Sequence, residues 1–234
     1  DSVKSRGLGD VYKRQQLVSV YLALRMQKLE WSEPLDDEEK QQSAWINLYV
    51  DAPLASRIGI FWIKSELEDR AFQILQPEQY ADLKRLVARK RDQRRMLVDK
   101  TLQEIQKMLK EAGLKHQVQG RYKRFYSIFE KLKRVDDDFE KIHDLTGFRV
   151  LVEHVRDCFT ALSYIHERWI PIDDRYKDYI SQPKPNGYQS LHTTVLNDEG
   201  EPLEIQIRTQ EMHRVAENGF AAHWLYKSSS DSPH

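Results

Sequence analysis

The chain has 234 residues, 40% of them hydrophobic, and its 37 basic side chains balance 37 acidic ones. This length and composition suffice for one large folded domain or two smaller ones, which excludes a disordered chain. No run approaches the roughly 18 consecutive apolar residues of a membrane helix, the beginning lacks the apolar segment of a signal peptide, and the zero net charge gives no general reason to bind nucleic acid or a membrane. We therefore expect a cytoplasmic protein.

The first half of the chain is expected to be helical. Residues 1–14 have no sustained apolar period and are set aside as non-native or disordered. A helix is expected from Gln15, with four residues near one apolar face, namely Leu17, Tyr21, Leu24 and Leu29. A second helix is expected over residues 38–54.

A long helix is expected to follow Pro77, because proline suits the first turn of a helix. Gly113 is placed to end this helix in a left-handed cap. The apolar residues of its second half recur at gaps of four and three, at Val98, Leu102, Ile105, Leu109 and Ala112.

The period of the sequence changes after Gly120. Apolar and polar residues alternate over residues 147–152, 191–195 and 203–208, which predicts three strands. A helix is expected over residues 157–169, and a hairpin turn is expected at residues 197–200. A last helix would carry Met212, Val215, Phe220 and Trp224. The fold class is therefore α+β, preceded by an all-helical segment.

A basic cluster occupies residues 120–134. Arginine grips phosphate with a planar fork and lysine supplies a mobile charge, so this density of cations suits a polyphosphate ligand. A solvated basic helix face is the alternative, and the cluster alone favours it. The cationic residues are Arg121, Lys123, Arg124, Lys131, Lys133 and Arg134.

Two carboxylates, Asp144 and Glu204, each lie beside a predicted strand. Brought together on a sheet they could hold Mg²⁺, which commonly uses one or two protein carboxylates together with substrate phosphates. Glu204, Gln206 and Arg208 share one strand face, which is either solvent-exposed or a polar site.

The run PKPNGYQSLHT, at residues 183–193, combines prolines and an Asn-Gly pair that stiffen and turn a loop. It leaves Tyr188 at a strand entrance, where its ring could stack on a nucleotide base. The alternative is a tyrosine packed at the end of a strand.

Several segments in order resemble the synthetase domain of the RelA/SpoT family of alarmone synthetases. The resemblance covers essentially all of residues 120–227, and it implies a nucleotidyltransferase-like mixed sheet flanked by helices. It divides the chain into a helical remnant of a hydrolase-like domain at 15–113, a synthetase domain at 114–228 and a tail at 229–234. The matching segments are GRYKRFYSIFEKL, HDLTGFRV, RYKDYI, PKPNGYQSLHT, EIQIRT, MHRVAE and AAHWLYK.

The resemblance implies that pyrophosphate passes from ATP to the 3′-hydroxyl of GDP or GTP, which yields (p)ppGpp and AMP in the stringent response. Asp144 and Glu204 would be catalytic and hold Mg²⁺, and Glu204 could also activate the hydroxyl. Arg121, Lys123 and Lys131 would bind the ATP phosphates, with Ser127 nearby, and Arg121 and Lys131 would also be catalytic. The guanine nucleotide would be bound by Tyr188, which stacks on the base, together with Lys177, Lys184, Asn186 and His192.

The segment Arg175–Asp178 resembles the basic Arg-x-Lys-Asp signature of the family, which implies ordinary use of magnesium. A charged loop is the alternative. Relatives that hydrolyse the alarmone carry a metal-binding aspartate in a segment like LADRLHN. This chain reads LALRMQK, with Leu24 at the aspartate and Lys28 at the asparagine, so we expect no hydrolase activity.

Three alternatives remain beside the synthetase. The first is a hydrolase of the same family, against which Leu24 argues. The second is a catalytically inactive protein that binds a guanine nucleotide for regulation. The third is a general RNA-binding protein, which the zero net charge disfavours, so we expect no direct nucleic-acid or membrane partner. The sequence leaves the oligomeric state open.

Overall fold

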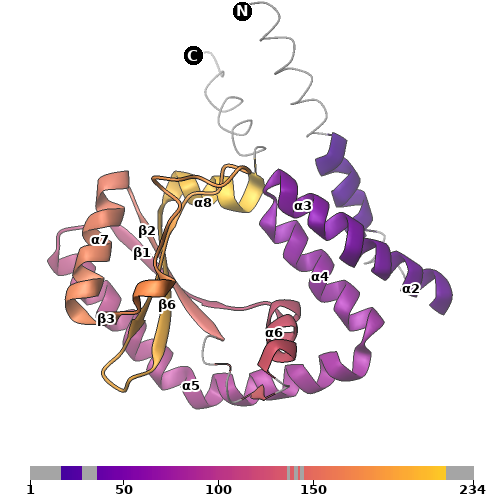
Figure 1. The fold of residues 1–234 in the computed structure, drawn as a ribbon, viewed down its shortest axis with the longest axis horizontal. Coiled ribbons are helices and arrows are strands. Elements are labelled where there is room, and N and C mark those ends of the chain that lie inside the picture. The colour runs from indigo at the N-terminus through magenta and orange to yellow at the C-terminus, as the bar shows by residue number, and fades with distance from the viewer. Residues whose placement is uncertain (1–16, 28–35, 136–137, 140–141, 143–144, 220–234) are drawn as a thin grey trace, which may run out of the picture. The chain divides into compact units, whose positions relative to one another are not determined.

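The computed structural model describes residues 17–27, 36–135, 138–139, 142 and 145–219 (Figure 1). The chain divides into two compact units. Asp1–Tyr80 with Arg214–His234 form what we call the helical unit, and Ala81–His213 form the sheet unit. No helix within the described ranges is both long and apolar enough to cross a membrane.

The helical unit consists of short helices around a small apolar core. Residues 17–27 are helical, and then come α2 (Asp37–Ile46), a π-helix (Asn47–Asp51), α3 (Ala52–Ile58) and α4 (Phe61–Leu75). The second helix of the sequence analysis is therefore present, but a π-turn interrupts it. Asp36 caps α2 by accepting a hydrogen bond from the backbone N–H of Glu39 at 2.8 Å.

The apolar face predicted for the first helix is wrong. The side chains that join the core are Leu22, Val18 and Met26, whereas Leu17 is 70% exposed and Leu24 is 60% exposed. This helix has apolar residues on more than one side, so spacing alone could not select the buried side. Leu29 lies outside the described residues.

The sheet unit begins within α5 (Pro77–Glu111), which Gly113 ends with φ +69° as predicted. The helices that follow are α6 (Phe125–Leu132), α7 (Val155–Arg168) and α8 (Gln210–Asn218), of which only the residues up to His213 belong to the sheet unit. The strands are β1 (His116–Tyr122), β2 (Thr146–Val152), β3 (Ile170–Pro171), β4 (Lys177–Asp178), β5 (Leu191–Leu196) and β6 (Pro202–Thr209).

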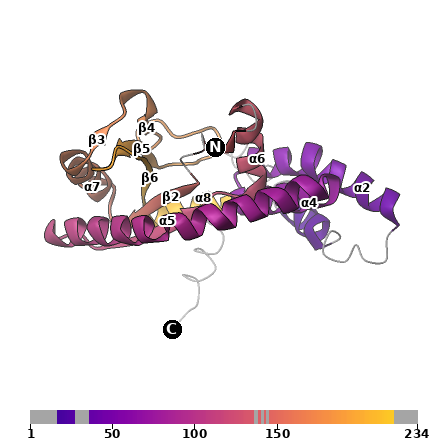
Figure 2. The ribbon, with the colours of Figure 1, turned by 90° about the horizontal axis from the view of Figure 1, so that it is seen from below.

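The strands of the described residues form one mixed sheet in the order β1-β2-β6-β5-β3, with β4 also paired to β5. The pair β2–β6 is parallel, and the other pairs are antiparallel. One face of the sheet is apolar and carries alternate strand residues such as Val150, Ile205 and Val195. The helices α5 and α7 pack against this apolar face (Figure 2), through residues such as Ile105 and Ile165.

The α+β class is confirmed, as are the three predicted strands, the hairpin turn and the helix at α7. Strand β1 was missed. Its sequence, HQVQGRY, has no apolar alternation, and Val118 is the one residue of the strand that packs against the core, as suits a strand at the edge of a sheet. The part of the last helix that would carry Phe220 and Trp224 lies outside the described residues.

The division of the chain into 15–113, 114–228 and tails stays a prediction. The compact units follow packing instead, and most of α5 belongs to the sheet unit because Val98, Ile105 and Leu109 lie in the core of the sheet.

Candidate active site

The face of the sheet opposite α5 and α7 is polar, and we call it the polar face. Strand register places Arg121 of β1 beside Gly147 of β2, Gly147 beside Glu204 of β6, and Glu204 beside Thr194 of β5. In the next row Arg149, Gln206 and His192 lie side by side. Side chains on one face of neighbouring strands are close enough to interact. The strands of His192 and Glu204, which the predicted turn at residues 197–200 joins, thus pair directly.

The carboxylate of Glu204 forms an ion pair on this face. Its Oε2 lies 2.9 Å from Nζ of Lys123, and both side chains are about a quarter exposed, at 26% and 29%. Gly147, the register neighbour of Glu204, contributes no side chain to the polar face, so space remains beside the carboxylate. Among the described residues, the nearest atom that a Cβ on Gly147 would meet, its chain neighbours apart, is the backbone oxygen of Glu204 at 3.5 Å.

Asp144, the second predicted carboxylate, lies outside the described residues. Its neighbour Leu145 is described, and the Leu145 carbonyl accepts a hydrogen bond from the backbone N–H of Lys123 at 3.0 Å. The chain is thus joined to the Lys123 segment one residue after Asp144. No group of three or more His, Cys, Asp or Glu side chains gathers within the described residues.

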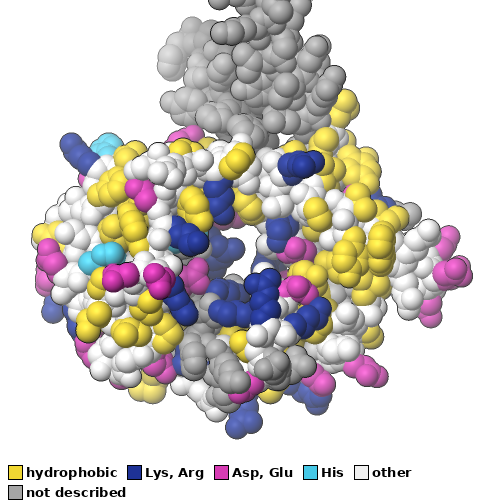
Figure 3. Space-filling view, in the orientation of Figure 1, with side chains coloured by type: hydrophobic (Ala, Val, Ile, Leu, Met, Phe, Trp, Pro, Cys, Tyr) yellow, Lys and Arg dark blue, Asp and Glu magenta, His cyan; other side chains and the backbone are white. Residues whose placement is uncertain are grey.

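The basic cluster is divided among several elements and is not one helix face. Arg121 lies on β1, Lys123 follows that strand, and Ser127 and Lys131 lie one turn apart on α6. Lys133 instead pairs with Glu130 at 2.8 Å and covers the ring of Phe129. Lysine and arginine side chains gather over α6 and the adjoining end of the sheet (Figure 3).

The loop before β5 brings together three rings and a lysine. The hydroxyl of Tyr188 lies 2.6 Å from Nε2 of His192, and the two ring centroids are 5.7 Å apart. Tyr179 stands edge-on to both, at 6.0 Å from Tyr188 and 5.4 Å from His192. Nζ of Lys184 lies 4.5 Å from the Tyr179 centroid and 5.4 Å from that of Tyr188.

Hydrogen bonds within the loop fix this arrangement. The side-chain oxygen of Asn186 accepts from the backbone N–H of Tyr188 at 3.2 Å, which closes a turn of the kind that asparagine favours. Gly187 follows with φ +76°, and the Lys184 N–H donates to the Tyr188 carbonyl at 3.1 Å. Lys177 of β4 is the register partner of His192, so it lies on the same row. The structure thus gathers the five residues that the sequence analysis assigned to the acceptor.

The electrostatics of the polar face keep this ring pair neutral. Burial, opposed by Glu204 and reinforced by the charges of Lys184, Arg208 and Arg121, lowers the pKa of His192 to about 4. Burial also raises the pKa of Tyr188, against the opposite effect of Arg208. At neutral pH both side chains are therefore uncharged, and the tyrosine hydroxyl shares a hydrogen bond with Nε2 of a neutral histidine.

Two arginines, Arg208 and Arg149, add positive charge to the polar face. Arg208 is only 2% exposed and donates from its guanidinium to Nδ1 of His213 at 2.7 Å. Its guanidinium carbon also lies 5.9 Å from the centroid of the Tyr188 ring. Arg149 is 8% exposed, and the sequence analysis gave it no role. Its alternation with Phe148 and Val150 was the signal that could have placed it on the face of Glu204.

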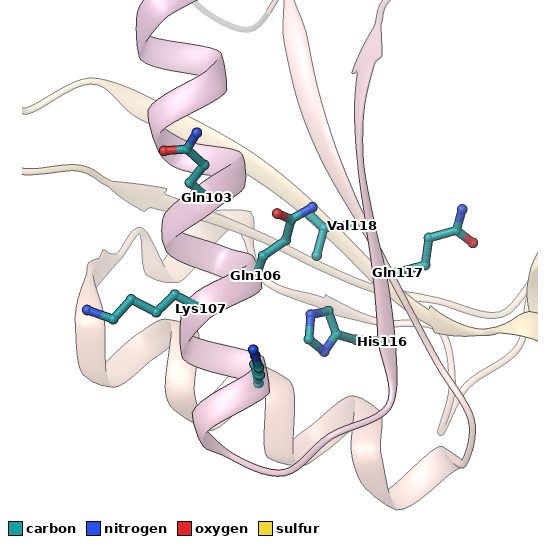
Figure 4. Close-up of a pocket in the computed structure, with 7 residues that line it drawn as sticks. Gln103, Gln106, Lys107, His116, Gln117 and Val118 are labelled. Carbon is teal, nitrogen blue, oxygen red and sulfur yellow. The ribbon is translucent and has the colours of Figure 1, made fainter.

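A separate open pocket lies between α5 and β1 on the edge of the sheet. Figure 4 shows Gln103, Gln106 and Lys107 on the helix, with His116, Gln117 and Val118 on the strand. None of the site residues predicted from sequence lines this pocket. The candidate site is therefore the polar face.

Comparison with known proteins supplies the family. Residues 120–231 match a family model described as the region found in RelA / SpoT proteins. Residues 120–231 of this chain belong to the RelA/SpoT family. The GTP pyrophosphokinase of Myxococcus xanthus is 42% identical over 212 residues, which is 91% of this chain and 28% of that protein. The bifunctional (p)ppGpp synthase/hydrolase RelA of Mycobacterium tuberculosis is 43% identical over 214 residues, or 92% and 29%.

This RelA/SpoT chain therefore spans less than a third of the length of these relatives. Among solved structures, the small alarmone synthetase 1 from Bacillus subtilis is similar with 26% identity and a TM-score of 0.46. That similarity covers 62% of this chain and 82% of the synthetase. The region matched by the family model includes strands β2, β5 and β6, which carry much of the polar face, and the loop with Tyr188.

Proposed function

We propose that this RelA/SpoT chain transfers the β,γ-pyrophosphate of ATP to the 3′-hydroxyl of GDP or GTP and so makes (p)ppGpp and AMP. Membership of the family supports this reaction, and relatives named GTP pyrophosphokinase support it further. The structural observation that carries it is the composition of the polar face. The Lys123–Glu204 ion pair and the Tyr188–His192 pair lie on neighbouring rows of the same sheet.

Cations around the start of α6 would bind the donor. Arg121, Lys123 and Lys131 would hold the ATP phosphates, with the hydroxyl of Ser127 beside them. Phosphoryl transfer depends on positioning and on neutralising the charge that builds up on the phosphate oxygens, and these side chains provide both. Arg121 also contributes to the electrostatics of His192, which places its charge near the acceptor end of the face.

The guanine nucleotide would lie on the loop before β5. Tyr188 would stack on the base, and Asn186 would hold the turn that presents this ring. Lys184 and Lys177 would bind the phosphates of the acceptor as mobile cations. His192, neutral at pH 7, would keep the Tyr188 hydroxyl in a fixed direction.

The reaction needs one proton acceptor and one leaving group. The 3′-oxygen of the acceptor attacks the β-phosphorus of ATP, and the bond from that phosphorus to the α,β-bridging oxygen breaks. AMP leaves with the bonding electron pair, and Glu204 receives the proton of the hydroxyl. Lys123 offsets the negative charge near Glu204 during this step.

Asp144 and Glu204 would hold Mg²⁺. Carboxylate oxygens are the ligands this ion prefers, and the absence of a side chain on Gly147 leaves room for it beside Glu204. With Mg²⁺ held by Asp144 and Glu204, the site would gain a Lewis acid that offsets the negative charge of the migrating group.

We further propose that the chain has no alarmone hydrolase activity. Leu24 has no atom that can bind a metal, and its side chain is 60% exposed on the first helix. We also place the reaction in the cytoplasm, where ATP and guanine nucleotides are available.

The test incubates the purified chain with ATP, GDP and Mg²⁺ and separates the nucleotides. We expect AMP and a new guanine nucleotide in equal amounts, and neither of them when GDP is omitted. If GDP binds but no AMP forms, the chain is an inactive nucleotide-binding protein and the proposal is wrong. A parallel incubation of (p)ppGpp with Mn²⁺ should release no pyrophosphate, and its release would contradict the proposed lack of hydrolase activity.

A further inference from the structure

Tyr179 has a position that the sequence analysis did not assign. It follows β4 directly, and its backbone N–H donates to the Ser190 carbonyl at 3.0 Å. This hydrogen bond continues the pairing of β4 with β5 and places the Tyr179 ring against the loop that carries Tyr188. The ring is half-buried there.

The contacts of Tyr179 connect it to three residues that would bind the acceptor. Its plane makes angles of 69° with the ring of Tyr188 and 89° with that of His192, which are edge-to-face arrangements. Tyr188 and His192 meet at 80°, so the three rings form a closed set in which each one blocks rotation of the others. Lys184 lies nearer to the Tyr179 ring than to the Tyr188 ring.

We propose that Tyr179 is a positioning residue for the guanine-nucleotide acceptor, acting through the Tyr188 ring and through Lys184. The inference rests on the proposed function. A base stacks well only on a ring whose plane is fixed in advance, because otherwise binding must first order that ring. The edge-to-face contact with Tyr179 restrains the plane of the Tyr188 ring, and at least one face of that ring is not covered by Tyr179. By attracting the ammonium group to its own face, it also holds Lys184 close to the place of the acceptor phosphates.

The ring of Tyr179, not its hydroxyl, should carry this role. Tyr179→Leu should raise the KM for GDP about five- to tenfold, because two edge-to-face contacts and one cation contact are lost. The KM for ATP and kcat should change less than about twofold, because Tyr179 touches neither the donor cations nor Glu204. Tyr179→Phe keeps the ring and should restore the GDP KM to within about twofold of the original chain.

Tyr164→Leu is the matched control, because Tyr164 is an exposed tyrosine on α7, on the apolar side of the sheet. It should leave all three kinetic constants unchanged. If Tyr179→Leu fails to fold by circular dichroism, Tyr179→Met removes the ring with a flexible side chain and serves in its place. An unchanged GDP KM in the folded variant would overturn the inference.

A double variant separates positioning from general damage to the loop. If Tyr179 acts through Tyr188, Tyr179→Leu should matter less once Tyr188 is gone. The fold-increase in the GDP KM that Tyr179→Leu causes in the Tyr188→Ala background should be less than half of the fold-increase that it causes in the original chain. The same full effect in both backgrounds would contradict action through the ring.

Direct binding of GDP, measured by calorimetry, distinguishes this inference from the proposed function. A chain that makes no product but binds GDP more weakly with Tyr179→Leu would contradict the synthetase reaction and support the role of Tyr179. If the original chain makes product, and GDP binds equally well to it and to the Tyr179→Leu variant, the synthetase reaction is supported and the role of Tyr179 is contradicted.

Discussion

The two faces of the mixed sheet are built from alternate residues of the same strands, yet they differ in almost every property. On the apolar face, Ile205 and Ile207 of β6 are fully buried against the residues of α5 and α7. On the polar face, Glu204 of the same strand forms an ion pair with Lys123, and the guanidinium group of Arg208 lies over the Tyr188 ring. One face therefore holds the fold together while the other is free to carry charge, which is how a single strand can serve both stability and chemistry.

Among the substitutions that test the difference between the two faces, Glu204→Gln should have the largest effect on activity. The substitution keeps the shape but removes the charge that would hold Mg²⁺ and accept the proton, so kcat should fall at least about a hundredfold. The melting temperature should change little, because Glu204 is on the polar face and partly exposed. Steady-state release of AMP measures the first quantity, and calorimetry measures the second.

Glu199→Gln is the matched control, since Glu199 is an exposed acid of the β5–β6 hairpin that pairs with Lys100. It should keep kcat. Asp144→Asn should lower kcat at least as strongly as Glu204→Gln does, and full turnover in that variant would remove Asp144 from the proposed metal site.

Ile205→Ala changes the residue next to Glu204 but on the opposite face. Deleting these buried methyl groups should lower the free energy of unfolding by about 2 to 5 kcal/mol. The KM values for ATP and GDP, measured on the folded protein, should be unchanged. Urea unfolding gives the first number. A chain with normal stability but impaired kinetics would show that the two faces are not separate in function.

The pKa of His192 gives a test based on pH. Because burial lowers this pKa from 6.5 to about 4, the unfolded chain binds more protons than the folded one between these values, and His192 makes the fold less stable as pH falls through that window. The contribution is of the order of 3 kcal/mol at its full extent.

His192→Gln removes this contribution, so the difference in unfolding free energy between the variant and the original chain should grow in favour of the variant from pH 7 to pH 4. Urea denaturation at a series of pH values measures it. A difference that does not depend on pH would mean that the His192 pKa is close to its ordinary value.

Tyr188→Ala should have the smallest of these effects, and it should be confined to the acceptor. A stacked aromatic ring contributes about 1 to 3 kcal/mol, so the KM for GDP should rise roughly five- to a hundredfold while the KM for ATP stays constant. Tyr188→Phe keeps the ring and should lose the hydrogen bonds of the hydroxyl, including the one to His192. Equal increases in both KM values would contradict a separate acceptor platform.

Much of the sheet could be predicted from sequence because its central strands have strict alternation. The register of Thr194 with Glu204 and of His192 with Gln206 follows from that alternation and from the Asn197–Gly200 turn. Strand β1 could not be found in this way, because Val118 is its one residue that packs against the core. Strands β3 and β4 are two residues long, too short for any period to be visible.

The candidate site was predictable where residues are close in sequence or share a strand. Tyr188, Asn186 and Lys184 lie in one turn, and family motifs drew attention to them. The position of Tyr179 depends on the path of the loop before β5, and the place of Arg149 beside Gln206 depends on which strand lies next to β2. Neither of these is visible in local sequence patterns. The catalytic and binding roles themselves stay predictions until they are measured.

The most direct test of the central claim is the fate of the β-phosphorus of ATP. The chain is incubated with Mg²⁺, GDP and ATP labelled at the β-phosphorus, and the nucleotides are separated. We predict that the label moves into the guanine nucleotide while an equal amount of unlabelled AMP appears. If the label stays in ATP or appears in ADP, the polar face does not transfer pyrophosphate.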